Sequence, residues 1–257
     1  MLLTVDIGNS MVTMGVFEEA DLVTTLRIAT ESRRSADEYG LMLTNLLQLN
    51  GIDRSKITDV CICSVVPPLT GVFEAVSETY FQIKPLTVTA GVRTGLQISY
   101  DNPKDVGADR IADAVAAKEL YGQPAIIVDF GTATVFDAIS KDGVYLGGAI
   151  SPGISVAAEA LFLNTSQLRR VELVAPKLAI GQNTTAALQA GLVLGYAELV
   201  KGLVARIKEE LGGSAVVVGT GGLANVISNE ADVFDAINPD LTLIGLRQIY
   251  DMNVKGG

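Results

Sequence analysis

Apolar residues in the first part of the chain recur with two different periods. Short apolar runs of the length of β-strands lie at residues 2–7, 11–17 and 22–28. Residues 35–49 then carry apolar side chains at helical spacing. Ser35 and Glu38 have the spacing of a capping box, which marks a helix start. The pattern predicts three strands followed by a helix.

The same order of elements recurs along the rest of the chain. Further strands are expected at 58–65, 86–89, 125–129, 134–140, 143–150, 215–218 and 241–244, and helices at 69–81, 106–120, after Pro152-Gly153, and at 184–211. Three strands followed by alternating helices and strands, seen twice, is the ribonuclease-H-like plan. The sequence therefore predicts an α/β protein of two ribonuclease-H-like domains, residues 1–118 and 119–257, with a cleft between them.

One junction between a strand and a polar turn occurs in both halves. Leu2–Ser10 and Ile126–Thr134 each begin as an apolar strand that runs into Asp-x-Gly, at Asp6 and at Asp129. Such a turn exposes backbone N–H groups that bind an anion, and the Asp at the strand end can face a cation. Two copies facing each other would clamp a phosphate chain, although Asp-x-Gly is also ordinary turn chemistry.

The amino-acid composition indicates which residues build the core and which kinds of catalytic site are excluded. Hydrophobic residues make up 49% of the chain and aromatic residues 5%, with no Trp, which predicts a core of Val, Ile, Leu and Ala around largely parallel sheets. Cys61 and Cys63 alternate along an expected strand and are predicted to be buried, reduced thiols. The chain has no His, which excludes Ser-His-Asp hydrolases and His-based zinc sites. A general base should therefore be a carboxylate.

Charge and hydropathy limit the partners. The formal net charge of −10 argues against nucleic-acid binding through phosphate contacts and against an anionic membrane surface, but not against small anionic ligands. No basic and apolar leader precedes Asp6. The most apolar later stretch, Leu188–Ile207, contains Glu198 and Lys201 and is not expected to span a membrane. A cytoplasmic protein with no nucleic-acid or membrane partner is predicted.

A glycine-rich stretch near the end of the chain offers an alternative. Gly219–Ala224 fits Gly-x-Gly-x-x-Ala after an apolar strand, which is typical of a dinucleotide-binding turn. Few residues follow it, and Asp240 precedes the next expected strand instead of ending it, which weakens that interpretation. No lysine-bearing P-loop sequence is present.

Together these residues resemble the type III pantothenate kinases, in a superfamily with sugar kinases, heat-shock ATPases and actin. The resemblance covers nearly the whole chain and is carried by motifs in a fixed order: Asp6–Ser10, Tyr100–Pro103, Gly107–Arg110, Asp129–Thr134, Gly147–Gly153, Ile180–Thr184 and Gly219–Gly222. Ser10 is a small departure, since the family more often has Thr there. The resemblance implies an actin-like duplication, a homodimer, and phosphorylation of the primary hydroxyl of pantothenate by ATP, the first step toward coenzyme A.

The resemblance also implies binding roles for individual residues. Thr132 and the first turn would bind the ATP phosphates, the turn residues being Asp6, Ile7, Gly8, Asn9, Ser10, Met11, Val12 and Thr13. Asp129 would hold a monovalent cation, potassium or ammonium, and Asp6 would lie near the magnesium-bound phosphates. Pantothenate would be bordered by Tyr100, Gly107, Ala108, Asp109, Arg110 and Thr184. By sequence alone, Tyr100 is a loop aromatic and Thr184 a helix N-cap.

Asp109 is the expected general base. It falls in the first turn of the expected helix 106–120, where the helix dipole favours the ionised carboxylate that accepts a proton from a hydroxyl. The alternative is that Asp109 only stabilises the helix terminus. Arg110 offers a planar fork for a carboxylate or phosphate oxygen, with a surface ion pair as its alternative. A kinase for another small hydroxylated or carboxylate metabolite and a non-catalytic regulator on the same fold stay open as alternative functions.

Overall fold

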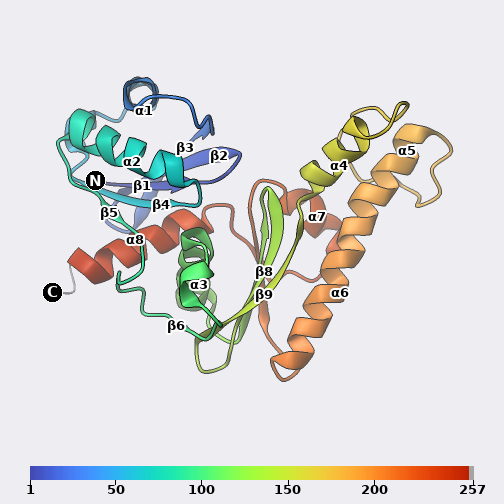
Figure 1. Ribbon diagram of the computed structural model, residues 1–257. Coiled ribbons are helices and arrows are strands. Elements are labelled where there is room, and N and C mark those ends of the chain that lie inside the picture. The colour runs from blue at the N-terminus through green and yellow to red at the C-terminus, as the bar shows by residue number, and fades with distance from the viewer. Residues whose placement is uncertain (255–257) are drawn as a thin grey trace. The chain divides into compact units, whose positions relative to one another are not determined.

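The computed structural model describes residues 1–254 and divides into two compact units (Figure 1). Unit 1 contains residues 1–96 and 101–116, together with Asp240 and the last helix, α8 (Leu241–Val254). Unit 2 contains residues 97–100 and 117–239. Each unit is built on one mixed β-sheet with helices.

The sheet of unit 1 has the strand order β3-β2-β1-β4-β5. Its strands are β1 (Leu2–Ile7), β2 (Met11–Glu18), β3 (Asp21–Ala29), β4 (Asp59–Ser64) and β5 (Leu86–Thr87). β1 is antiparallel to β2 and parallel to β4, so its backbone is hydrogen-bonded on both sides. The helical segments are α1 (Ala36–Leu49), η1 (Arg54–Lys56), α2 (Pro67–Val76), the π-helical turn η2 (Ser77–Phe81), η3 (Pro103–Asp105), the start of α3 (Ala108–Tyr121), and α8.

Helix α1 starts with the predicted capping box. The Ser35 hydroxyl accepts a hydrogen bond from the Glu38 backbone N–H at 3.3 Å, and the Glu38 carboxylate accepts one from the Ser35 backbone N–H at 2.8 Å. Two backbone donors that the helix leaves unpaired are thereby satisfied. The periodicity and the cap together located this helix from the sequence.

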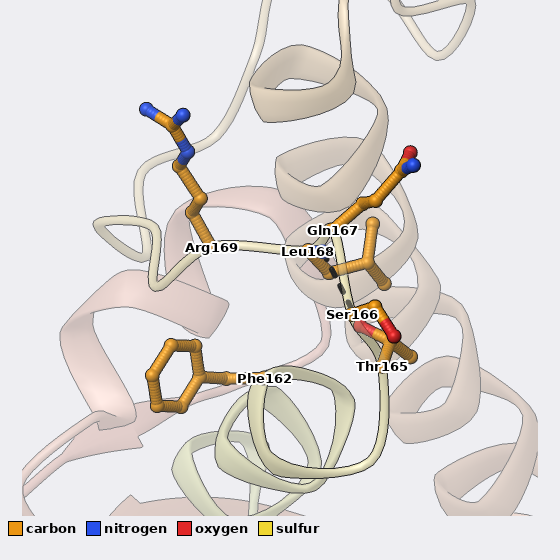
Figure 2. Close-up of a pocket in the computed structure, with 6 residues that line it drawn as sticks. All are labelled: Phe162, Thr165, Ser166, Gln167, Leu168 and Arg169. Atoms are coloured by element: carbon orange, nitrogen blue, oxygen red, sulfur yellow. Dashed lines mark hydrogen bonds between the residues drawn. The ribbon is translucent and has the colours of Figure 1, made fainter.

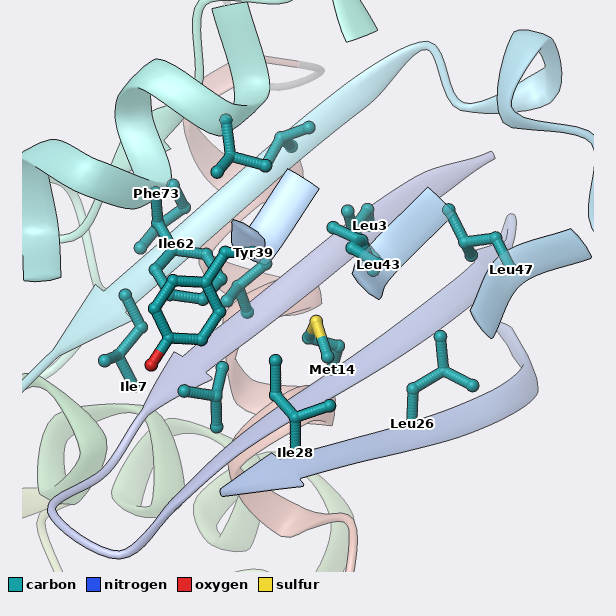
Figure 3. Close-up of a cluster of buried hydrophobic side chains, with 14 of the residues drawn as sticks. Leu3, Ile7, Met14, Leu26, Ile28, Tyr39, Leu43, Leu47, Ile62 and Phe73 are labelled. Atoms are coloured by element: carbon teal, nitrogen blue, oxygen red, sulfur yellow. The ribbon is translucent and has the colours of Figure 1, made fainter. Parts of the chain in front are cut away.

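Both faces of the unit 1 sheet are buried. One face packs against α1 and α2 through a cluster that includes Leu3, Met14, Tyr39 and Phe73 (Figure 3). The other face contributes Cys61 and Cys63 to a second cluster, with Leu243 and Leu246 of α8. Both cysteines are free thiols with 0% exposure, as predicted. Because strand residues alternate between the two faces, a strand covered on both sides is apolar throughout, which explains the uninterrupted apolar runs.

The predicted strand at 241–244 is wrong, because these residues begin helix α8. A short apolar run fits a buried strand and a buried helix equally well, and periodicity over four residues cannot separate them. The helical spacing appears only over the longer segment, where Leu246, Ile249 and Tyr250 are also buried. Helix α8 packs against β1 and β4, so the end of the chain is grouped with unit 1, whereas the predicted boundary assigned it to the second domain.

Unit 2 repeats the strand order of unit 1 and adds one strand. Its sheet has the order β11-β10-β7-β8-β9-β6, in which β9-β8-β7-β10-β11 corresponds to β3-β2-β1-β4-β5. The strands are β6 (Gln97–Ile98), β7 (Ala125–Phe130), β8 (Ala133–Ile139), β9 (Val144–Pro152), β10 (Val216–Thr220) and β11 (Ala236–Ile237). The directions also agree, since β7 is antiparallel to β8 and parallel to β10. The predicted duplication of the ribonuclease-H-like plan is confirmed.

The helices of unit 2 include one long apolar segment. They are α4 (Ile154–Leu163), α5 (Thr184–Gln189), the π-helical turn η4 (Ala190–Leu194), α6 (Gly195–Glu210) and α7 (Ala224–Ala231). Among the described residues, Thr184–Glu210 is the one helical segment whose length and mean hydropathy of 1.3 would allow it to cross a membrane. Its buried side chains Ala197, Val200 and Val204 belong to the core of unit 2. A core helix of a soluble protein meets the same criterion, so this segment is weak support for a membrane span.

Candidate active site

The first predicted phosphate-binding turn joins β1 to β2 in unit 1. The Gly8 N–H donates to the carbonyl of Met11 at 3.0 Å and closes the turn, which leaves Asn9 and Ser10 exposed at its tip. Thr30, at the end of β3, holds the turn from the side, since its hydroxyl donates to the Gly8 carbonyl at 2.7 Å and its N–H donates to the Ser10 carbonyl at 3.0 Å. The turn is therefore fixed by backbone bonds while its tip faces solvent.

Asp6 and Asp109 lie close together in unit 1, although they are far apart in the sequence. Parallel pairing sets Asp6 at the end of β1 directly beside Cys63 of β4, and the Cys63 thiol donates to the Asp6 carboxylate at 3.3 Å. Burial and, to a smaller extent, the charge of Asp109 raise the pKa of Asp6, the thiol hydrogen bond lowers it, and the net result is a pKa of about 7. The pKa of Cys63 is also raised, first by burial and then by the Asp6 and Asp109 charges. Two carboxylates and one thiol thus form a single electrostatic cluster.

The start of α3 sets the position of the Asp109 side chain. Asp109 lies in the first turn of the helix, where the backbone dipole favours a negative charge. One of its carboxylate oxygens accepts a hydrogen bond from the Arg110 backbone N–H at 2.8 Å and lies over the Cα of Gly107, where a larger residue would collide with it. The predicted Gly107–Arg110 segment is therefore one structural element, and Gly107 is required because the Asp109 carboxylate folds back over it.

The raised pKa of Asp6 predicts a specific pH dependence of stability. Between the ordinary Asp value of 3.8 and about 7, the unfolded chain loses the Asp6 proton while the folded chain keeps it, so stability falls as pH rises. The fall is at most about 1.4 kcal/mol per pH unit for one proton, and less here because Asp6 is only partly buried. In Asp6→Asn this component should disappear, so the variant should gain in melting temperature relative to wild type from about pH 4 to about pH 8.

The control for the Asp6 measurement is Asp142→Asn, which removes one carboxylate from an exposed hairpin turn. It should follow the wild-type pH profile of melting temperature. Parallel profiles for wild type and Asp6→Asn would contradict the raised pKa of Asp6.

The second predicted turn, in unit 2, joins β7 to β8 and is one residue shorter than the first. The Gly131 N–H donates to the carbonyl of Ala133 at 3.0 Å, and Thr132 is exposed at the tip. Gly153 packs against this turn, and its N–H donates to the Thr132 carbonyl at 3.0 Å. A Cβ on Gly153 would collide with the backbone of Gly131 and Thr132. Each Asp-x-Gly junction is thus a turn between two antiparallel strands that starts with a glycine N–H bond to a backbone carbonyl, but the two turns differ in length by one residue.

Asp129 lies between two glycine-containing turns of unit 2. β7 and β10 are parallel neighbours that pair Asp129 with Thr220, so the turn after β10 reaches the Asp129 carboxylate. A Cβ at Gly221, whose φ is +88°, would collide with that carboxylate, and a Cβ at Gly131 would lie 3.6 Å from it. The glycine cluster that resembled a dinucleotide-binding turn therefore lies beside Asp129.

The surroundings of Asp129 suit a weakly held cation. Residues 1–254 contain no group of three or more Asp, Glu, Cys or His side chains able to hold a metal ion. A divalent ion bound tightly by protein alone needs several carboxylates, so Asp129 by itself does not form such a site. The residues present are compatible with potassium or ammonium, and with magnesium only as a companion of a bound phosphate.

Tyr100, a predicted substrate-binding residue, follows the edge strand β6 in unit 2. β6 pairs with β9, and the Ser99 N–H extends this pairing by donating to the Tyr145 carbonyl at 2.8 Å. The Tyr100 ring is 37% exposed and lies 6.5 Å from the ring of Tyr145, measured between centroids. Tyr100 is therefore a partly exposed aromatic residue mounted on an ordered sheet edge.

The sequence alone suggested Thr184 as the N-cap of its helix, and this prediction is wrong. The cap is Asn183, whose side chain accepts a hydrogen bond from the Ala186 N–H at 2.9 Å, and Thr184 is the first residue of α5. The predictions misplaced the cap by one residue because Asn and Thr both favour this position. Strand β6, which leads into Tyr100, and helix α5 lie at opposite ends of unit 2 (Figure 1). Helix α5 and strand β6 are therefore not neighbours within this unit.

A surface cavity of about 640 Å³ lies at the end of α4 and is separate from these residues. Its lining is Phe162 with Thr165–Arg169, and the Leu168 N–H donates to the Thr165 hydroxyl within it (Figure 2). None of the predicted site residues lines this cavity. Despite its volume, this cavity is not the candidate active site, because its lining residues include no carboxylate and no anion-binding turn.

The structure shows several contacts to the predicted site residues that the sequence analysis did not predict. These are Cys63 beside Asp6, Gly153 beneath the second turn, Gly221 beside Asp129, and Tyr145 with Gly147 beside Tyr100. All of them act across neighbouring strands, and strand register is not visible in a single sequence. The two Asp-x-Gly turns were found because that signal is local.

The sequence profile of the type III pantothenate kinases matches residues 2–206. A type III pantothenate kinase of Roseiflexus sp. (strain RS-1) is 51% identical over 253 residues, covering 98% of this chain and 99% of that protein. The type III pantothenate kinase of Syntrophus aciditrophicus (strain SB) is 49% identical, with 98% and 100% coverage. The chain belongs to the type III pantothenate kinase family. This membership confirms the family resemblance that the motifs carried.

Solved structures place this type III pantothenate kinase family member in the predicted fold class. A putative Baf family transcriptional activator from Campylobacter jejuni matches with a TM-score of 0.65 and 20% identity, covering 98% of this chain and 99% of that one. Component A of the Acidaminococcus fermentans (R)-2-hydroxyglutaryl-CoA dehydratase matches with a TM-score of 0.56 and 12% identity, covering 97% and 96%. At these identities the similarity shows a shared fold and nothing of function. The chain therefore shares its α/β fold of two mixed sheets with both of these structures.

Proposed function

We propose that this chain transfers the terminal phosphoryl group of ATP to the primary hydroxyl of pantothenate, the first step of coenzyme A biosynthesis, with Asp109 as general base. The observation that carries the proposal is the placement of Asp109 at the helix start of α3, in one cluster with Asp6 at the end of β1. Family membership supports the substrate and the enzyme class.

The two turns suit the phosphate chain of ATP. Phosphoryl transfer asks the protein mainly to position its partners and to stabilise charge on the phosphoryl oxygens. Exposed, backbone-closed turns at Gly8–Ser10 and Gly131–Thr132 offer N–H and hydroxyl donors for this purpose. Magnesium bound with ATP supplies further charge neutralisation.

Asp109 and Arg110 have complementary tasks in this mechanism. The Asp109 carboxylate accepts the proton that the pantothenate hydroxyl loses as its oxygen bonds to the γ-phosphorus, while the bond from that phosphorus to the bridging oxygen breaks and ADP leaves. Asp6 is partly buried and interacts with the charge of Asp109. Both effects raise its pKa, so the Asp6–Asp109 cluster binds a proton more readily than a carboxylate in water does. Arg110 directly follows Asp109, and its guanidinium fork suits the carboxylate of pantothenate or a phosphate oxygen.

The monovalent cation is assigned to Asp129. The Asp129 carboxylate, which lies beside Gly131 and Gly221, would supply an oxygen ligand to a potassium or ammonium ion there. Its chemical contribution is positive charge beside the phosphate chain of the nucleotide.

A kinase assay tests the reaction and the cation together. Desalted protein with ATP, magnesium and potassium or ammonium should form phosphopantothenate, and replacing these ions with sodium should lower the rate. Simple sugars and acetate should not be phosphorylated. Equal rates in sodium and potassium would remove the cation role, and phosphorylation of another acceptor without pantothenate turnover would reject the substrate.

The position of Thr184 supports a homodimer. If Tyr100 and Thr184 both border pantothenate and lie at opposite ends of unit 2, Thr184 must be supplied by a second copy of the chain. The apolar helical segment Thr184–Glu210 carries Gly191 and Gly195, and a Cβ at either would meet no described atom within 4 Å beyond its own helix. Such open glycines allow another helix to approach closely.

A cytoplasmic location is proposed because the proposed reaction belongs to coenzyme A biosynthesis.

A further inference from the structure

The ring of Tyr100 lies against Gly147 of β9, which has no side chain. A Cβ built on Gly147 would lie 2.7 Å from Cε2 and 2.9 Å from Cδ2 of Tyr100, closer than side-chain carbons approach each other. Any residue other than glycine at this position would therefore move the ring.

A local irregularity of β9 produces this contact. Ala138 of β8 is paired with Gly147, whereas the next residue, Ile139, is paired with Tyr145, so Leu146 is an extra residue in β9. An extra residue of this kind bends a strand and re-aims its neighbours. Gly147 adopts a φ of +97°, which side chains rarely tolerate. The bulge explains both the positive φ of Gly147 and the contact of Gly147 with the Tyr100 ring.

A buried hydrogen bond fixes the neighbouring ring. Tyr145 is 0% exposed and its hydroxyl donates to the Asp137 carboxylate of β8 at 2.7 Å, while Asp137 is itself 2% exposed. Hydrogen bonds to a carboxylate in a buried site are stronger than those between neutral groups. Because the Tyr145 backbone also accepts the Ser99 N–H, the segment that carries Tyr100 is bonded to the same residue.

We propose that Gly147, together with the Tyr145–Asp137 pair, positions the Tyr100 ring as a wall of the pantothenate pocket and thereby sets the affinity for this substrate. The inference rests on the proposed role of Tyr100 in binding pantothenate. Gly147, Tyr145 and Asp137 are positioning residues, since they act through Tyr100. Tyr100 is 37% exposed, and the apolar face of a tyrosine ring suits the two methyl groups that pantothenate carries beside its primary hydroxyl.

Gly147→Ala in the full-length protein is the main test. The added methyl group should displace the Tyr100 ring and raise the KM for pantothenate by about tenfold, the loss of one good apolar contact. The KM for ATP should stay near the wild-type value, because the two turns are untouched. Tyr145→Phe, which keeps the ring and removes only the hydroxyl, should raise the KM for pantothenate by a smaller factor.

A double-mutant cycle separates positioning from general damage. In a Tyr100→Ala background there is no ring to displace, so adding Gly147→Ala should cause no further rise in the KM for pantothenate. Gly143→Ala is the matched control for backbone strain: it lies in the same hairpin with a φ of +75°, and its Cβ would meet only the side-chain ends of Gln123 and Lys118. It should lower the melting temperature as Gly147→Ala does, without changing the KM for pantothenate.

Three outcomes would overturn the inference. The first is a folded Gly147→Ala protein with a wild-type KM for pantothenate. The second is an equal rise in that KM with and without the Tyr100 ring. The third is a Tyr100→Ala protein with a wild-type KM, which removes the role of Tyr100. Absence of pantothenate phosphorylation by the wild-type protein would instead reject the proposed function, so the two failures are distinguishable.

Discussion

Asp109→Asn is expected to lower kcat by about 10² to 10⁴, the usual loss when a positioned general base is removed. The amide keeps the shape of the carboxylate and can still accept the Arg110 N–H, so the start of α3 should stay folded. The KM values for ATP and pantothenate should change much less than kcat, because the proton is transferred only during the chemical step. Steady-state kinetics of the purified variant make this measurement.

The matched control for Asp109→Asn is Glu119→Gln, which removes one exposed carboxylate from the same helix. Its kcat should equal that of wild type. The variant offers a second readout, because the charge of Asp109 helps to raise the pKa of Asp6. Removing that charge should lower the pKa of Asp6. A kcat close to wild type, in a protein with the Asp6 pKa lowered, would assign Asp109 to electrostatics alone.

Gly245→Ala is expected to destabilise the protein by about 1–3 kcal/mol, although alanine normally stabilises a helix. Gly245 is buried in α8, and a Cβ there would collide with the backbone carbonyl of Ala112 in α3. Backbone cannot move aside as a flexible side chain can, so the two helices must separate. For a chain of this size the loss corresponds to a fall of about 2–4 °C in melting temperature per kcal/mol.

Gly202→Ala is the matched control, because Gly202 is also inside a helix but a Cβ there meets no described atom of another segment within 4 Å. It should gain about 0.5–1 kcal/mol from helix propensity. Opposite signs for the two substitutions would establish the close contact of α8 with α3. Stabilisation by both would show that this contact is absent. Since α3 carries Asp109, Gly245→Ala should also lower kcat.

The sequence alone was enough to propose the site residues that lie at strand ends, and their roles remain predictions. Asp6 and Asp129 were identified because Asp-x-Gly after an apolar strand is a pattern within a few residues. The duplicated plan of elements followed from the repetition of apolar periods along the chain, and the matching strand orders of the two sheets agree with it.

Features that depend on neighbouring strands and packed helices were decided by the tertiary structure. Parallel register brings Cys63 beside Asp6 and Gly221 beside Asp129, and a bulge in β9 presents Gly147 to Tyr100. Helix α8 was predicted as a strand because four apolar residues fit both structures until packing against β1 and β4 decides between them. The sequence by itself determined the repeated plan and its acidic turns, since these depend on residues adjacent in the chain. The fold alone determined which distant side chains share a charge or a contact, because those free energies depend on distances that exist only once the strands are paired.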